Sequence, residues 1–92
     1  MATIEIRRDH ALGLEKAREA AVKVAKKLEE RIQVRYRWEG DDLALERTGA
    51  TGRFHIREDE VHVQIDLGFA LRPLKGRVTQ RVHDYIDEYF QS

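Results

Sequence analysis

One stretch of the sequence, residues 14–32, constrains the fold most strongly, because its apolar residues recur every three or four positions. They are Leu14, Ala17, Ala20, Ala21, Val24, Ala25, Leu28 and Ile32. This spacing places them on one face of an α-helix, and mostly lysine and glutamate occupy the opposite side. The segment is therefore predicted to be an amphipathic helix. We expect Asp9 to cap its start, because a carboxylate can accept hydrogen bonds from the unpaired amides of the first turn.

A second amphipathic helix is predicted from about residue 75 to residue 90. Its apolar stripe consists of Val78, Val82, Tyr85, Ile86, Tyr89 and Phe90. Pro73 precedes it, at a position where proline is tolerated because the first amides of a helix have no partner within the helix. Each helix is apolar on one side only, so both are expected to cover the apolar face of another layer.

The residues between the two helices alternate between apolar and polar in four short segments, as strands do. The segments are 34–38, 43–47, 52–56 and 61–67, and a fifth segment, 3–7, precedes the first helix. Gly49 lies in the turn between the second and third segments and Gly52 follows it, but the lysine that a phosphate-binding loop requires is missing. The order of elements predicts a single α+β domain over residues 1–92, with an antiparallel five-stranded sheet and two helices on one face.

Residues that pair across two strands share a face of the sheet, so the hairpins give an expected register. The expected pairs are Trp38 with Leu43, Arg35 with Glu46, Leu45 with Phe54, Glu46 with Arg53, Phe54 with Val63 and His55 with His62. One face then carries apolar rows for the helices to cover. The other carries a polar ladder of Arg35, Glu46 and Arg53.

Residues with catalytic or metal-binding chemistry are few in this chain. His55 and His62 can supply two metal ligands, but a third is needed and the chain has no cysteine, so two solvated histidines are favoured. His10 can act as a general base, yet no nucleophile or second carboxylate stands at a suitable spacing, and a capping or turn role is favoured. We therefore predict no catalytic residue, no metal and no cofactor.

The charges of the 92-residue chain cancel, with 17 basic and 17 acidic side chains. A neutral molecule has no overall field that attracts nucleic acid, and the strand aromatics are expected on the face opposite the sheet arginines, so nucleic-acid binding is disfavoured. The sequence shows no signal peptide and no apolar run of the ~20 residues that span a bilayer. Together with the lack of cysteine, these features predict a cytoplasmic protein.

Apolar residues gather around residues 67–74 and at the end of the second helix in greater number than one helix contact requires. The expected association surface consists of Leu71, Leu74, Tyr85, Tyr89 and Phe90. Closure of one end of the core is the favoured interpretation, and docking of a second subunit, an apolar ligand or a hydrophobic particle is the alternative. A ligand held between the sheet and the second helix is instead expected to contact Tyr36, Phe54, Val63 and Val82.

Several segments, in matching order over nearly the whole chain, together resemble the small bacterial polyhydroxyalkanoic acid system proteins. They are residues 4–13, the helix through Lys26-Lys27-Leu28, and residues 36–41, 71–76 and 85–90. The resemblance implies a cytoplasmic accessory role linked to storage granules and brings no defined catalytic residues. The element order also resembles a shortened helix-grip fold, in which a C-terminal helix packs in the concavity of a sheet and apolar ligands often bind.

Three functions are compatible with these features. The leading hypothesis is a non-enzymatic accessory protein of polyhydroxyalkanoate metabolism that binds a granule, a granule protein or a second copy of itself through apolar contacts. The alternative is a small carrier that holds a hydroxyacyl or fatty acyl chain inside the domain. The third, a hydrolase or isomerase that uses His10, requires a pocket around that side chain.

Overall fold

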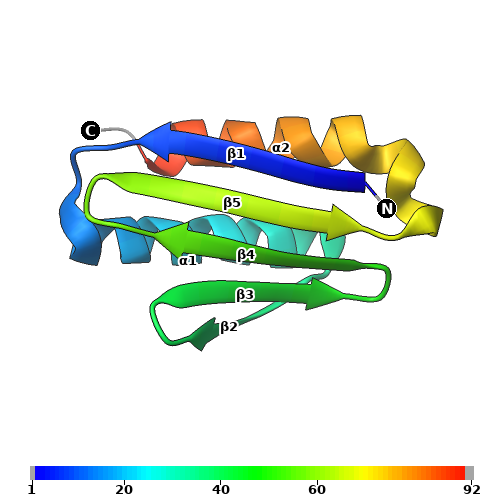
Figure 1. The fold of residues 1–92 in the computed structure, drawn as a ribbon, viewed down its shortest axis with the longest axis horizontal. Helices are drawn as coiled ribbons and strands as arrows, with labels where there is room; N and C mark the ends of the chain where they lie inside the picture. Colours follow the sequence, from blue (N-terminus) through cyan, green and yellow to red (C-terminus); the bar gives the residue numbers. More distant parts are fainter. Residues whose placement is uncertain (1, 91–92) are drawn as a thin grey trace.

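An antiparallel five-stranded sheet forms one layer of the molecule, and two antiparallel helices form the other (Figure 1). The computed structural model describes residues 2–90. The elements are β1 (Ala2–Asp9), α1 (Gly13–Ile32), β2 (Arg35–Glu39), β3 (Asp42–Arg47), β4 (Ala50–Ile56), β5 (Glu60–Leu67), the 3₁₀ helix η1 (Phe69–Leu74) and α2 (Lys75–Tyr89). The strand order is β1-β5-β4-β3-β2, so the last strand of the meander pairs with the first strand of the chain. The predicted α+β class and order of elements are confirmed.

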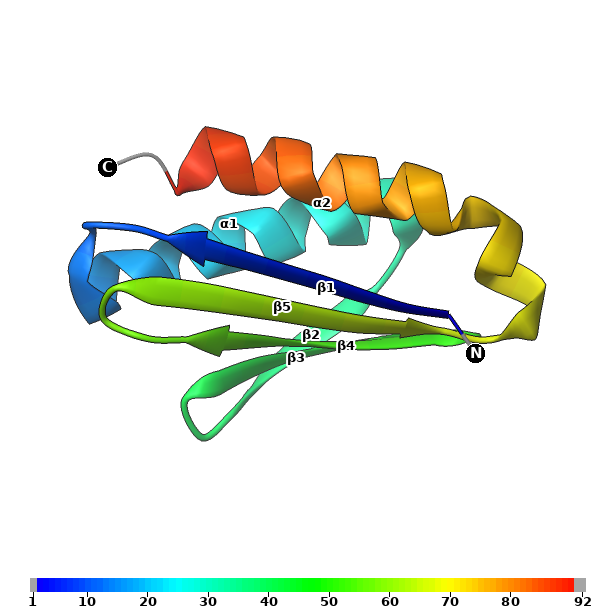
Figure 2. The same ribbon diagram turned by 45° about the horizontal axis from the view of Figure 1, so that its top comes forward.

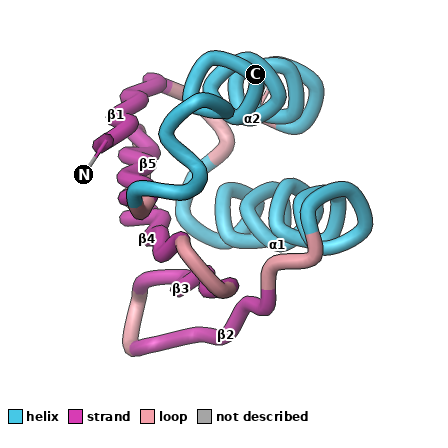
Figure 3. Tube along the Cα trace, turned by 90° about the vertical axis from the view of Figure 1, so that its right-hand side faces the viewer, coloured by secondary structure: helices cyan, strands magenta, loops and turns pink. Residues whose placement is uncertain are grey.

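The two helices lie side by side above the same face of the sheet (Figure 2). Seen end-on, α2 covers β1 and β5, whereas α1 lies over β4 and over β3 and β2, which curl beneath it (Figure 3). Ala17, Ala21 and Ala25 are fully buried in α1. Their short side chains allow the helix backbone to approach the neighbouring layer closely.

Large apolar side chains fill the space between the layers. The largest fully buried ones are Phe54, Leu28, Leu43, Leu67, Ile86, Val24, Val61, Val63 and Val82. Both helices and the inner positions of β3, β4 and β5 contribute to this set. The alternation read from the sequence therefore assigned the inner face of these strands correctly.

The register agrees with prediction for the first and last hairpins of the meander. The confirmed pairs are Trp38 with Leu43, Arg35 with Glu46, Phe54 with Val63 and His55 with His62. For the middle hairpin, β3–β4, the prediction was wrong by two residues. The observed pairs there are Leu45 with Gly52, Glu46 with Thr51 and Ala44 with Arg53. A shift of two residues keeps every side chain on its predicted face, so the polar ladder remains on the outer face although its middle pair is displaced.

The cause of this displacement is the β3–β4 turn, which is shorter than the sequence suggested. Arg47 pairs with Ala50, and only Thr48 and Gly49 lie between them. Gly49 has φ +86°, a left-handed conformation that a two-residue hairpin turn needs and that glycine adopts without strain.

The prediction that Asp9 caps the first helix was wrong. Asp9 is the last residue of β1 and pairs with Glu60, and α1 begins only at Gly13. Leu12 occupies the N-cap position and no side chain caps the helix there. The strand continues beyond the predicted boundary because β5 supplies hydrogen-bonding partners along its whole length.

Candidate association surface

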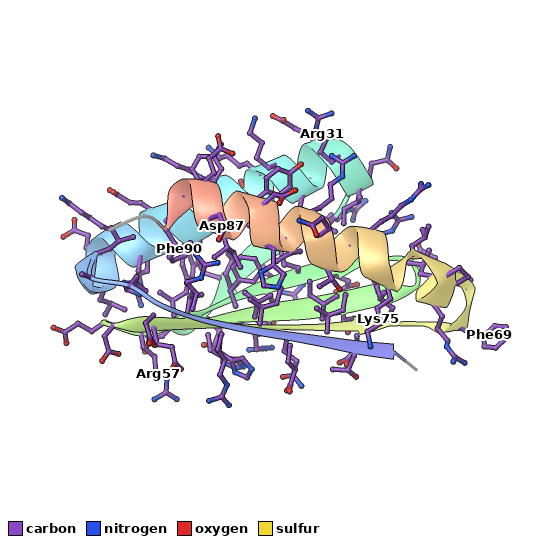
Figure 4. The ribbon with its side chains drawn as sticks, turned by 90° about the horizontal axis from the view of Figure 1, so that it is seen from above. Arg31, Arg57, Phe69, Lys75, Asp87 and Phe90 are labelled. Atoms are coloured by element: carbon purple, nitrogen blue, oxygen red, sulfur yellow. The ribbon has the colours of Figure 1, made fainter. Side chains whose placement is uncertain are left out.

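The η1 segment projects from one end of the molecule, between the end of β5 and the start of α2 (Figure 2). None of its six residues is buried. Phe69 is 83% exposed and Leu74 is 41% exposed, and Figure 4 shows Phe69 pointing away from the rest of the molecule. Large exposed apolar side chains on a small domain are candidates for a contact site.

Short backbone contacts hold η1 in this position. The Gly68 amide donates a hydrogen bond to the Gly49 carbonyl oxygen at 2.7 Å. A Cβ atom at Gly68 would lie 3.1 Å from the same oxygen, so glycine allows the close approach. On the other side, Leu71 covers Gly49, and Pro73 fixes the backbone within η1. The segment that carries Phe69 is therefore anchored to the β3–β4 turn.

Basic residues lie next to the exposed apolar groups along the chain. The Arg72 guanidinium lies 6.0 Å from the centre of the Phe69 ring, within reach of a cation–π interaction. Lys75 and Arg77 follow and are exposed. Residues 67–83 contain no aspartate or glutamate. We call Phe69, Arg72, Leu74 and Lys75 the η1 corner.

The structure does not bring the five residues of the expected association surface together. Leu71 and Leu74 lie at η1, whereas Tyr89 and Phe90 lie at the far end of α2, about 20 Å away for a helix of this length. Tyr85 and Tyr89 are partly buried against the core, and Phe90 is only 2% exposed. Phe69 lies in the apolar segment noted in the sequence but was not predicted to be part of the association surface. The feature that could have identified it is an aromatic residue that belongs to no helical or strand stripe.

His10 joins three parts of the chain through contacts of its backbone and both ring nitrogens. Its side chain is buried, the Leu12 amide donates to Nδ1 at 3.2 Å, and Nε2 lies 3.1 Å from the Arg57 carbonyl oxygen. Its own amide donates to the Asp59 carbonyl oxygen, and its ring packs against Phe90 with 5.7 Å between centroids. The geometry fits the neutral ring with the proton on Nε2. Neither nitrogen is free to act as a base, and the residue fastens the β1–α1 connection.

His55 and His62 stack on the outer face of the sheet, with 5.7 Å between ring centroids. His55 Nδ1 lies 3.0 Å from an Asp42 carboxylate oxygen. Within residues 2–90, no three histidine, cysteine, aspartate or glutamate side chains gather closely enough to hold a metal ion. Through Asp42, His55 belongs to a polar network on the outer face, against which His62 stacks.

Hydrogen bonds in the same network change the pKa of one carboxyl group and of one guanidinium group. Glu39 accepts hydrogen bonds from Arg37 and Arg53, and these bonds lower the pKa of its carboxyl group. Arg53 also contacts Asp42, and its hydrogen bonds to the two carboxylates raise the pKa of its guanidinium. The arginines of this face are thus partly neutralised by carboxylates, which differs from the locally basic platform that a nucleic acid would need.

An apolar cavity of about 50 Å³ lies between the helices and the sheet. This volume holds one or two water molecules, whereas small-molecule sites occupy about 300–1,000 Å³. Of the four residues expected to line a ligand site, only Val82 borders it. Phe54 and Val63 are fully buried in the core, and Tyr36 lies on the edge strand β2. The structure thus gives no support to an acyl carrier.

Fold and surface together define a small α+β domain with an anchored, exposed apolar corner set among basic residues. No helix within residues 2–90 is long and apolar enough to cross a membrane.

The chain belongs to the polyhydroxyalkanoic acid system family. The model of this family, described as "Putative polyhydroxyalkanoic acid system protein", matches residues 4–90, which confirms the resemblance read from the sequence. No curated protein and no solved structure matches the chain. The family description relates the protein to polyhydroxyalkanoate systems and assigns no catalytic activity.

Proposed function

We propose that this protein is a non-enzymatic, cytoplasmic accessory protein of polyhydroxyalkanoate metabolism that binds the storage granule through the η1 corner. The observation that carries the proposal is the 83% exposure of Phe69 on a segment anchored to the sheet. Family membership supplies the kind of partner, since a polyester particle offers an extended apolar surface.

Burial of Phe69 would contribute free energy to such binding. Transfer of a largely exposed phenylalanine side chain from water to an apolar surface contributes about 1.5–3 kcal/mol before the costs of association. Leu74 adds a smaller contribution because it is already half covered. Anchoring of η1 limits the conformational entropy that binding must remove.

The test is co-sedimentation with isolated polyhydroxyalkanoate granules and with protein-free polyester particles. The double variant Phe69→Ser/Leu74→Ser is expected to remain in the supernatant. Its matched control is Trp38→Ser/Leu14→Ser, which removes an aromatic and a leucine that are each 41% exposed elsewhere on the surface. This control is expected to sediment like the wild type.

Three outcomes decide between partners. Binding of the wild type to both particles supports contact with the polyester. Binding only to native granules moves the partner to a granule protein. A wild type that stays wholly in the supernatant with both particles ends the proposal.

A further inference from the structure

The exposed side of α2 carries its charges in two blocks. Arg77 and Arg81 come first, and Asp84 and Glu88 follow at spacings that place all four on one line along the helix. All four side chains are exposed. Among residues 2–90, none has an oppositely charged partner within 4.0 Å. We call these four residues the α2 charge line.

This order of charges is unfavourable for an isolated helix. The amino end of a helix favours carboxylates and its carboxyl end favours cations, yet the first turn of α2 has no acidic residue and the last turn has no basic one. Arg77 and Arg81 also repel each other at a spacing of four residues, as do Asp84 and Glu88. Within the helix, only the step from Arg81 to Asp84 places opposite charges three residues apart, and an alternating order would stabilise the helix more. A contact outside the helix would compensate for this arrangement.

The charge line is complementary to a second copy of itself in antiparallel orientation. Arg77 and Glu88 are equally distant along the chain from the midpoint between Val82 and His83. Arg81 and Asp84 are equally distant from the same point. A two-fold axis through it places every arginine opposite a carboxylate of the other copy, and the two helix dipoles are then also opposed.

The surroundings of the line favour the same partner. Arg31 at the end of α1 borders a groove of about 310 Å³ that Arg77 and Arg81 also line, so three arginines lie around the place where carboxylates of a second copy would arrive. Val78 and Tyr85 lie beside the line and are only partly buried. Seen end-on, no other element covers the side of α2 that faces away from the sheet (Figure 3).

We propose that two copies of this chain associate through α2, in antiparallel orientation, with the α2 charge line setting the alignment. Val78 and Tyr85 contribute apolar contact. Exposed ion pairs add little affinity individually, so the charges mainly fix register and exclude the parallel arrangement, in which like charges would meet. Leu74 of the η1 corner also lines the groove beside Arg77 and Arg81, but neither Phe69 nor Leu74 is part of the α2 charge line, so the inference does not depend on granule binding.

The decisive experiment uses paired charge reversals and analytical ultracentrifugation at low salt, from about 10 µM to about 1 mM, where small interfaces associate. We expect a monomer–dimer equilibrium for the wild type that weakens as salt is added. Arg77→Glu/Arg81→Glu should weaken it at least ~10-fold, and Asp84→Arg/Glu88→Arg should do the same. An equimolar mixture of the two variants should recover dimers, because each supplies the charge that the other needs.

The matched control is Lys23→Glu/Lys26→Glu, which makes the same change in net charge at exposed positions of α1. It is expected to leave the dissociation constant within about threefold of the wild-type value. Circular dichroism verifies that each variant is folded. A wild type that is monomeric throughout, equal weakening by the α1 control, or a mixture that stays monomeric overturns the proposal.

Discussion

Phe90 is assigned to the stability of the fold and Phe69 to binding, and replacing each by alanine tests this assignment. Phe90 is 2% exposed and packs against the buried His10 ring, whereas Phe69 is 83% exposed. Truncation of a buried phenylalanine costs about 3–5 kcal/mol. Phe90 follows the last turn of α2, where neighbours can relax, so we expect about 3 kcal/mol for Phe90→Ala. Phe69→Ala should change the free energy of unfolding by less than about 0.5 kcal/mol.

A loss of about 3 kcal/mol is large for a chain of this length, whose total stability is about 5–14 kcal/mol. It should lower Tm by about 12–24 °C, which thermal and urea denaturation followed by circular dichroism will resolve. The slope of the urea transition should not change if only native packing is lost. A cost below about 1 kcal/mol for Phe90→Ala, or above it for Phe69→Ala, would refute the assignment.

Two further substitutions test local features. Gly49→Ala forces a left-handed backbone on a residue with a Cβ, and that atom would lie 3.3 Å from Leu71, so we expect a loss of about 1–3 kcal/mol in urea denaturation; an unchanged midpoint would contradict the tight turn. The pKa of Glu39 is lowered in the folded protein from its ordinary value of 4.5. Its ion pairs with Arg37 and Arg53 therefore stabilise the fold at pH values above 4.5, and this contribution is lost as the pH falls through the lowered pKa. Glu39→Gln should therefore flatten the decline of stability in acid, whereas a parallel decline in wild type and variant would show that the pairs contribute nothing.

The sequence predicted the layers well because the period of apolar residues depends only on local geometry. The apolar stripes over residues 14–32 and 75–90 match α1 and α2 within one residue at each end, although the predicted Asp9 cap implied an earlier start for α1, and the strand faces follow from alternation. The register of β3–β4 was less secure, since four turn-forming residues, 48–51, allowed several hairpin lengths and only the backbone of Gly49 decides between them.

The association surface was harder to predict because exposure is a property of the tertiary structure. Phe90 continues the line of Val82 and Ile86 at spacings of four, which already indicates burial, but its contact with His10 joins residues 80 positions apart. Phe69 lies in a segment with no helical or strand period. Its projection depends on the contact between Gly68 and Gly49, which no local pattern records.

Granule binding through the η1 corner is most directly tested by placing a single fluorescent tryptophan at position 69. The variant Phe69→Trp/Trp38→Phe has one tryptophan, at the η1 corner, since the natural chain contains a single tryptophan. Addition of protein-free polyester particles should shift its emission to shorter wavelength, because the indole ring leaves water for an apolar surface. Sedimentation of the variant with the particles while its emission stays unchanged would contradict the account.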